Sequence, residues 1–212
     1  MEFKDFIQKY GNLPIIETEN LFAGISDPRA IQVQISRWEK SGRLIQLRRG
    51  IYLLAEPYRK VEIFGAYLAS TLKRPSYISL EKALEFHHLI PEAVYVYTCV
   101  TTKRPREFVT PAATVHYRHI QTSLFWGYAS VTMNNQTAFM AHPEKALLDL
   151  FYLKEIKVTI EYLKELRLQN LEEFNLKRFF DYARRFQKPR ILKAAQLFQQ
   201  HMEIEQGQEK TL

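Results

Sequence analysis

The densest group of side chains that could do chemistry lies between Ser26 and Gly50. Against two acidic residues, that segment holds six basic ones: Arg29, Arg37, Lys40, Arg43, Arg48 and Arg49. A guanidinium group can form paired hydrogen bonds with the edge of guanine, and both arginine and lysine neutralise phosphate. These residue types point to a nucleic acid as ligand, provided that the local structure presents them together.

Two short helices are predicted ahead of the basic segment. Apolar residues from Phe3 to Tyr10 recur at helical spacing, which indicates a first helix over residues 2–10. Thr18 can cap a second short helix, which Gly24 should end. This order of elements leads directly into the basic residues.

A third helix and a hairpin carry the basic residues themselves. Capping residues followed by Pro28 form a strong start signal for a helix that should reach about Lys40. Gly42 supplies the left-handed residue that commonly follows a helix. The sequences RLIQL and IYLLA then predict two strands around a tight turn that contains Arg48 and Arg49.

The third helix is expected to have an apolar face and a polar face. Steps of about 100 degrees per residue place Ile31, Ile35 and Trp38 on one stripe, which should pack against the first two helices. The opposite face should hold Arg29, Gln32, Val33, Ser36, Arg37 and Lys40. Arginine can read guanine, glutamine can read adenine, and valine can meet a thymine methyl group, so this face suits the major groove of DNA.

The hairpin extends the same hypothesis. A basic hairpin after a recognition helix can act as a wing, which lies along neighbouring phosphates or in the minor groove. Residues predicted to contact the DNA backbone are Lys40, Arg43, Arg48 and Arg49. The alternative is a solvated helix face beside ordinary turn residues, because most charged faces have no partner.

The segment resembles the winged helix-turn-helix of the AbiEi antitoxin family. The shared pattern is W-x-x-x-G-x-L-x-x-L-x-x-G-x-Y, carried here by Trp38, Gly42, Leu44, Leu47, Gly50 and Tyr52. The resemblance continues in the same order through residues 75–92, 94–106 and 141–152. Beyond residue 155 only the helical character is shared.

The resemblance implies a transcriptional regulator of a type IV toxin-antitoxin or abortive-infection system. Antitoxins of this kind repress their own promoters through inverted repeats, which implies double-stranded DNA as a partner and a homodimer on one site. The second domain would then counteract a nucleotidyltransferase-type toxin, or serve dimerisation or effector binding in a stand-alone regulator. Both possibilities stay open.

The rest of the sequence predicts a larger α+β domain over residues 58–212, behind a winged helix-turn-helix domain over residues 1–57. An amphipathic helix over residues 61–72 and a second one capped by Ser79 come first. The β-branched and aromatic runs that follow indicate a small, mainly antiparallel sheet. Helices are then expected to complete the α+β fold.

These C-terminal helices should begin at Pro143, near Asn175 and after Pro189, and the last ten residues are expected to be disordered. A second basic cluster lies within them, at Lys177, Arg178, Arg184, Arg185, Lys188 and Arg190. It could contact flanking DNA phosphates or an acidic toxin surface, or it could be a solvated amphipathic face.

The helix that Pro143 opens also allows a catalytic alternative. Glu144, Lys145 and Asp149 could form the carboxylate and lysine group of a nuclease or transferase. The simpler interpretation is a helix start, with His142 as the cap and Glu144 at the positive end of the helix dipole. We therefore predict no catalytic residue. Because the histidines lack metal-ligand spacing and the chain has a single cysteine, no metal or cofactor is expected.

The composition fits a soluble regulator of the cytoplasm. Of the 212 residues, 46% are hydrophobic, which is typical of a folded protein. The formal net charge of +7 favours a polyanionic partner. No signal-peptide pattern opens the chain, and no run approaches the roughly 18 apolar residues of a membrane span. The sequence thus favours a DNA-binding antitoxin and autorepressor, with a regulator that lacks a toxin partner as the alternative.

Overall fold

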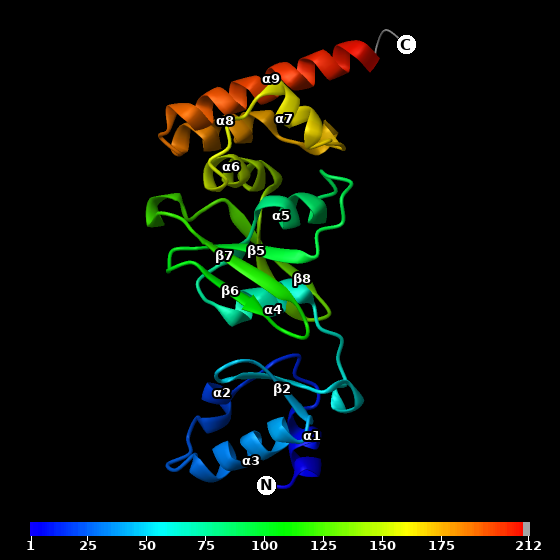
Figure 1. Cartoon of the computed structure of the whole chain (residues 1–212), viewed down its shortest axis with the longest axis vertical. Coiled ribbons are helices and arrows are strands. Elements are labelled where there is room, and N and C mark those ends of the chain that lie inside the picture. The colour runs from blue at the N-terminus through cyan, green and yellow to red at the C-terminus, as the bar shows by residue number, and fades with distance from the viewer. Residues whose placement is uncertain (210–212) are drawn as a thin grey trace.

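The computed structural model describes the backbone of residues 1–209 and the side chains of residues 1–204. A small N-terminal unit, a mixed sheet and a group of C-terminal helices follow one another along the long axis of the molecule (Figure 1). The mixed α+β architecture predicted from the sequence is confirmed.

The N-terminal unit contains the predicted helices and hairpin. Its elements are α1 (Phe3–Tyr10), β1 (Ile16–Glu17), α2 (Thr18–Phe22), α3 (Arg29–Lys40), β2 (Leu44–Arg48) and β3 (Ile51–Leu54). Strand β1 was not predicted, because a two-residue strand has too little pattern to recognise. It pairs antiparallel with β3, and the strand order in this sheet is β1-β3-β2.

The core of this unit depends on Trp38 of α3. Its side chain is 5% exposed, and its ring centroid lies 5.3 Å from that of Phe3 and 4.7 Å from that of Phe6. The helix therefore buries its predicted apolar stripe against α1 and against one face of the sheet. Residues buried in this first core are Phe6, Ile16, Leu21, Ile35, Trp38, Leu44, Tyr52 and Leu54.

The sheet of the N-terminal unit is covered on both faces. All four residues of β3 are buried. Tyr52 and Leu54 belong to the first core, whereas Ile51 and Leu53 belong to the second core together with Leu47. Side chains alternate across a strand, so the two sets point to opposite faces. The hairpin is thus held between α1 and α3 on one side and the rest of the chain on the other (Figure 1).

The second unit is built on a sheet with strand order β6-β7-β5-β4-β9-β8. Its strands are β4 (Tyr77–Ile78), β5 (Val96–Thr101), β6 (Arg106–Val109), β7 (Thr114–His119), β8 (Tyr128–Met133) and β9 (Gln136–Ala141). The pairs β4–β9 and β5–β7 are parallel and the other neighbours are antiparallel. The predicted mainly antiparallel sheet is confirmed, but β4 and β6 were not foreseen.

Helices cover this sheet on both sides. They are α4 (Gly65–Leu72), α5 (Leu80–Phe86), α6 (Pro143–Leu153), α7 (Ile160–Glu165), α8 (Leu176–Arg185) and α9 (Pro189–Glu209). Helix α4 lies on the side of the N-terminal unit, and α5 and α6 lie on the other side, followed by α7, α8 and α9 (Figure 1). The predicted helix starts at Pro143, near Asn175 and after Pro189 are confirmed.

One predicted boundary was wrong. Helix α4 begins at Gly65 rather than at residue 61, because the Gln136 side chain holds the preceding backbone outside the helix. The Gln136 amide oxygen accepts from Phe64 N at 3.0 Å, and its amide nitrogen donates to the Glu62 carbonyl at 2.7 Å. Helix α9 ends at Glu209, and the expected disorder of the last ten residues stays a prediction. Residues 210–212 lie outside the described part of the chain.

A buried polar network joins β4 to α6. Ser79 was expected to cap α5 with its hydroxyl, but that hydroxyl donates to Asp149 at 2.8 Å instead. Tyr77 donates to the same carboxylate at 2.9 Å and accepts from the Lys145 ammonium at 2.8 Å. Lys145 and Asp149 also pair directly, and both side chains are fully buried. Burial lowers the pKa of Lys145, and Asp149 opposes that shift.

Glu144 makes the same kind of interior contact. Its side chain is fully buried and accepts from the backbone N of Asn175 and from Arg178, both at 2.9 Å. Pro143 opens α6 as predicted, but the His142 ring bonds the Tyr182 hydroxyl at 3.0 Å and provides no side-chain cap. The residues weighed for catalysis are thus fully buried, and they join α6 to α8 and to the sheet.

We expect Trp38→Ala to destabilise the protein by about 3–5 kcal/mol, since it removes the largest side chain between α1, α3 and the sheet. Val33→Ala is the matched control on the same helix, because Val33 is 50% exposed and its loss should change stability by no more than about 0.5 kcal/mol. Urea denaturation followed by circular dichroism measures both. Equal losses in the two variants would contradict the assigned helix orientation.

Lys145→Met should cost about 3–5 kcal/mol of unfolding free energy, because it leaves the buried Asp149 carboxylate without its cation. The double variant Lys145→Met/Asp149→Leu should lose less than the sum of the two single variants, since the charges are removed together. Additive losses in a denaturation cycle would show that the two residues do not act as a pair.

Candidate nucleic-acid interface

Helix α3 brings together the residues predicted to read bases. Its buried residues are Ile35 and Trp38. The other face exposes every member of the predicted set, which is Arg29, Gln32, Val33, Ser36, Arg37 and Lys40. Val33 is the only large apolar side chain among them and is 50% exposed. An exposed aliphatic residue flanked by long polar side chains is suited to the edges of base pairs.

Local contacts fix both ends of this helix. At the start, the Asp27 carboxylate accepts from the backbone N of Arg29 at 3.1 Å and from its guanidinium at 2.9 Å. These bonds lower the pKa of Asp27. At the end, Gly42 adopts a φ of +70°, as the sequence predicts for a residue that closes a helix. The polar face is therefore presented by a helix with well-defined ends.

Arg29 differs from the other basic residues of the face because it has an acidic partner. The Asp27 and Arg29 side chains are 57% and 85% exposed, and an ion pair in that setting is weak. A phosphate could therefore compete for the guanidinium. By contrast, Arg37, Lys40, Arg48 and Arg49 form no ion pair within residues 1–204.

The tip of the hairpin is held against the start of α2. Gly50 has a φ of +82°, and its carbonyl accepts from Thr18 N at 2.9 Å and from the Thr18 hydroxyl at 3.3 Å. Thr18 is the first residue of α2, and its hydroxyl holds this turn instead of capping the helix. Arg48 and Arg49 remain exposed beside this fixed turn.

Arg43 has a packing role in addition to its charge. Its guanidinium lies over the Phe3 ring, 4.9 Å from the centroid, at the junction of α1 and β2. The stacked guanidinium keeps its charge and an exposed side, so it can still meet a phosphate. The structure thus places all nine predicted DNA-binding side chains at the surface.

The second basic cluster is different because most of its arginines are used within the chain. Arg178 pairs with Glu144 at 2.9 Å, and Arg184 pairs with Asp181 at 2.7 Å. Arg185 lies over the Trp126 ring, 4.2 Å from its centroid. The Arg190 guanidinium donates to the carbonyls of Phe151, Tyr152 and Ile156. The arginines of α8 and α9 are therefore engaged in contacts within the chain.

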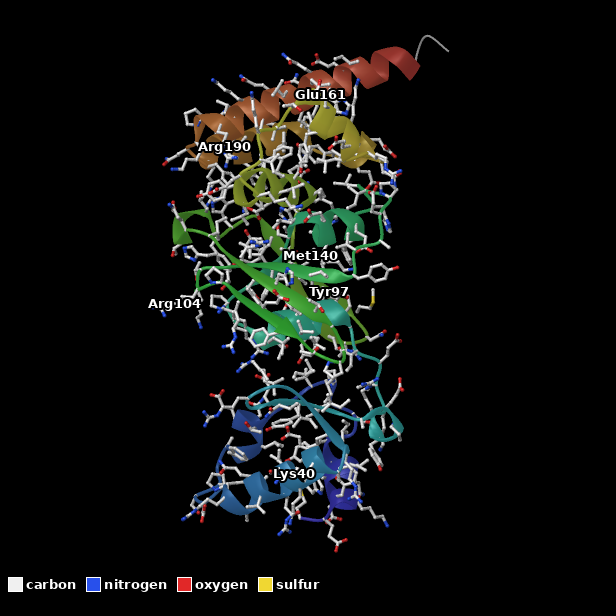
Figure 2. All side chains as sticks on the ribbon, in the orientation of Figure 1. Lys40, Tyr97, Arg104, Met140, Glu161 and Arg190 are labelled. Atoms are coloured by element: carbon white, nitrogen blue, oxygen red, sulfur yellow. The ribbon has the colours of Figure 1, made fainter. Side chains whose placement is uncertain are left out.

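Lys177 and Lys188 are exposed members of that cluster, so contact with a partner stays a prediction for them. The cluster is also remote from the winged unit. Arg190 lies among the C-terminal helices, at the opposite end of the molecule from Lys40 of α3 (Figure 2). The two basic regions that the sequence analysis identified therefore do not form one continuous surface.

The structure exposes further basic residues that the sequence analysis did not select. Lys103, Arg104 and Arg106 follow β5 and are exposed, and Lys73 follows α4. The first three lie in the short run KRPR. The Lys73 ammonium donates to the Arg104 carbonyl at 2.7 Å, and this contact between distant segments could not be read from the sequence.

The described residues show neither a membrane-spanning helix nor a metal cluster. No helix among them is long and apolar enough to cross a membrane. Within the same residues, no group of three or more His, Cys, Asp or Glu side chains could hold a metal ion. His116 lies beside Glu107, with Nε2 and Oε1 3.3 Å apart.

Comparison with known proteins agrees with this geometry. A family model described as "Transcriptional regulator, AbiEi antitoxin" matches residues 20–55. A search of curated proteins finds no match. The matched residues run from α2 through α3 and the hairpin, so they include the exposed helix face and the wing. The resemblance seen in the sequence is therefore confirmed for residues 20–55, which are similar to the AbiEi antitoxin family of transcriptional regulators.

Proposed function

We propose that the protein is a DNA-binding transcriptional regulator that reads its operator with the outward face of α3. The observation that carries this proposal is the exposure of the whole predicted set on one helix face while the opposite face is buried. The alternative, a helix face that only contacts water, gives no reason for the fixed turn with Arg48 and Arg49 beside it. The match of residues 20–55 to a family of regulators supports the same conclusion.

The side chains divide by chemistry into two groups. Gln32, Val33, Ser36 and Arg37 lie along the middle of the exposed face, where a helix in the major groove approaches base edges. Contacts to phosphate are assigned to Arg29, Lys40, Arg43, Arg48 and Arg49, which flank that region. Phosphate contacts supply affinity and orientation, and base contacts supply specificity.

The protein is further proposed to act as the autorepressor and antitoxin of a toxin-antitoxin pair. The description of the matching family supports this role. Repression through inverted repeats would place two copies of the chain on one operator, as a homodimer. Residues 1–57 would bind the DNA in the cytoplasm, and residues 58–212 would engage a nucleotidyltransferase-type toxin. A regulator without a toxin is the alternative.

Two single variants test the readout by α3 and the wing. Arg37→Ala should weaken binding to the promoter region upstream of the protein's own gene by about 1–3 kcal/mol and relax the preference for one base pair. Arg48→Ala should weaken binding to all sequences alike and reduce the salt dependence by about one phosphate contact. Titration by fluorescence anisotropy at several salt concentrations measures both effects.

Lys193→Ala provides the matched control for these variants, because it removes an exposed positive charge from α9. It should bind like the wild type, and all three variants should unfold at the wild-type denaturant midpoint. A promoter footprint that is missing at moderate salt would refute the autorepressor proposal, whatever the variants do.

The antitoxin role can be separated from repression in the full-length chain. Truncation at residue 58 is unsuitable, because it would uncover the face on which Leu47, Ile51 and Leu53 pack. We expect Arg37→Ala/Arg48→Ala to release a promoter reporter from repression while still rescuing growth from a neighbouring nucleotidyltransferase-type toxin. If the wild type itself fails to rescue, the antitoxin role is wrong and the regulator without a toxin remains.

A further inference from the structure

A cavity of about 450 Å³ lies where the wing hairpin, the linker and the second unit meet, and we call it the junction cavity. Ile45 of β2 and Leu53 of β3 line it from the hairpin, and Leu68 of α4 lines it from the second unit. The linker, residues 55–64, leads from the hairpin to α4 and lines another side (Figure 1). Pockets of this volume hold small organic ligands.

The floor of the junction cavity is apolar. Leu53 and Leu68 are each 1% exposed and belong to the core of the second unit. Ile45, Ile63 and Pro111 add further apolar surface to the lining. A floor of this kind favours an aliphatic or aromatic group over a sugar or a phosphate.

Arg59 is the cation of the cavity. Its side chain is 21% exposed, and its acidic partner is Glu56, with Nη2 and Oε1 3.8 Å apart. The Glu56 side chain is 90% exposed, so this ion pair is weak. Within residues 1–204 the Arg59 guanidinium donates no hydrogen bond, although it carries five N–H donors. A carboxylate in the cavity would therefore meet donors that the chain leaves open.

Two carboxylates stand at the edge of the same cavity. Glu56 and Glu62 are exposed, and both line it. Among the described side chains, Glu62 forms no ion pair. Its carbonyl is held by the Gln136 amide at 2.7 Å, which fixes this part of the linker. The two glutamates repel a ligand that carries only negative charge and attract an ammonium group.

We propose that the junction cavity binds an apolar amino acid as an effector. The ligand carboxylate binds the Arg59 guanidinium, and the ligand ammonium group lies near Glu56 and Glu62. The apolar side chain of the ligand covers the floor of the cavity. A carboxylic acid would leave both glutamates without a partner, and an amine would leave Arg59 without one. Charge complementarity therefore selects a zwitterion.

A ligand in this cavity contacts both units at once. Ile45 and Leu53 belong to the hairpin that carries Arg48 and Arg49, and Leu68 belongs to the second unit. The ligand therefore stabilises the arrangement in which the wing is held against the second unit. A wing that is already ordered loses less freedom when it binds DNA, so the ligand raises promoter affinity. This effector role rests on the proposed function, whereas binding of the amino acid does not.

Binding is tested on the full-length protein without DNA, by isothermal titration calorimetry and by the midpoint of thermal unfolding. The probes are L-leucine and L-phenylalanine. Their analogues without the ammonium group are isocaproate and hydrocinnamate, and those without the carboxylate are isoamylamine and phenethylamine. We expect one of the amino acids to bind with a Kd of about 1 mM or lower, at least about tenfold more tightly than its analogues. Failure of both amino acids to bind overturns the proposal, as does an analogue that binds equally well.

Charge variants of the linker test the assigned polar contacts. Arg59→Gln should weaken amino-acid binding by about tenfold or more and leave the amines unaffected. Glu56→Gln/Glu62→Gln should remove the preference for the amino acid over the carboxylic acid. Lys60→Gln is the matched control, because Lys60 is an exposed linker cation that does not line the cavity. If Arg59→Gln binds like the wild type, or if Lys60→Gln loses as much, the proposal is wrong.

A change of volume tests the position of the ligand independently of charge. Ala112 is exposed and lines the cavity from the loop between β6 and β7, so Ala112→Phe should occupy part of it and weaken binding by about tenfold. Val109→Phe is the control, since Val109 is 75% exposed and lies outside the lining. Both variants should unfold at the wild-type midpoint without ligand. Equal effects of the two variants on binding would place the ligand elsewhere and overturn the proposal.

Titration of the promoter duplex with and without saturating amino acid tests the effector role. Promoter affinity of the wild type should rise by about fivefold or more, and that of Arg59→Gln should not change. An unchanged wild-type affinity would refute the effector role and leave the readout by α3 intact. If the wild type binds the amino acid but no promoter duplex, the proposed function fails and the ligand site stands.

Discussion

The burial of β3 on both faces is the constraint on which the rest of the structure depends. Tyr52 and Leu54 face the core around Trp38, and Ile51 and Leu53 face the core of the second unit. Rotation of the hairpin would expose one of these apolar sets to water, at a cost of about 25 cal/mol for each Å² uncovered. The wing is therefore not a free arm, and its arginines stand at a position that both cores determine.

The two basic regions of the sequence differ in what their arginines bind within the chain. Arg178 and Arg190 are long-range structural residues, one bound to a buried carboxylate and the other to the carbonyls at the end of α6. Removing such a residue leaves buried acceptors without donors, which costs stability. Arg37 and Arg49 satisfy no buried group, so selection for folding alone gives no reason for their charge. That difference makes the winged unit the better candidate for a polyanion.

Local pattern predicted the parts of the structure that depend on neighbours in sequence. Helical spacing and turn residues were sufficient for α3, the hairpin and the exposed set around Arg37, because each is defined within a few residues. Strands β1 and β4 were missed, since each has two residues and exists only through pairing with distant strands. Ser79 followed the capping pattern, yet its hydroxyl binds Asp149, 70 residues away. Such a contact has no local signal, and the bond between Lys73 and the Arg104 carbonyl could not be predicted for the same reason.

The two units are joined by polar bonds as well as by the shared apolar face. Arg74 bonds Glu17, and the backbone N of Lys60 donates to the Gly11 carbonyl at 3.2 Å. Independent motion of the units would break these contacts together and expose Leu47 and Ile51. The position of the wing tip therefore depends on the second unit as well as on α1 and α3, so a change in packing at this junction would reach the wing without any contact to α3.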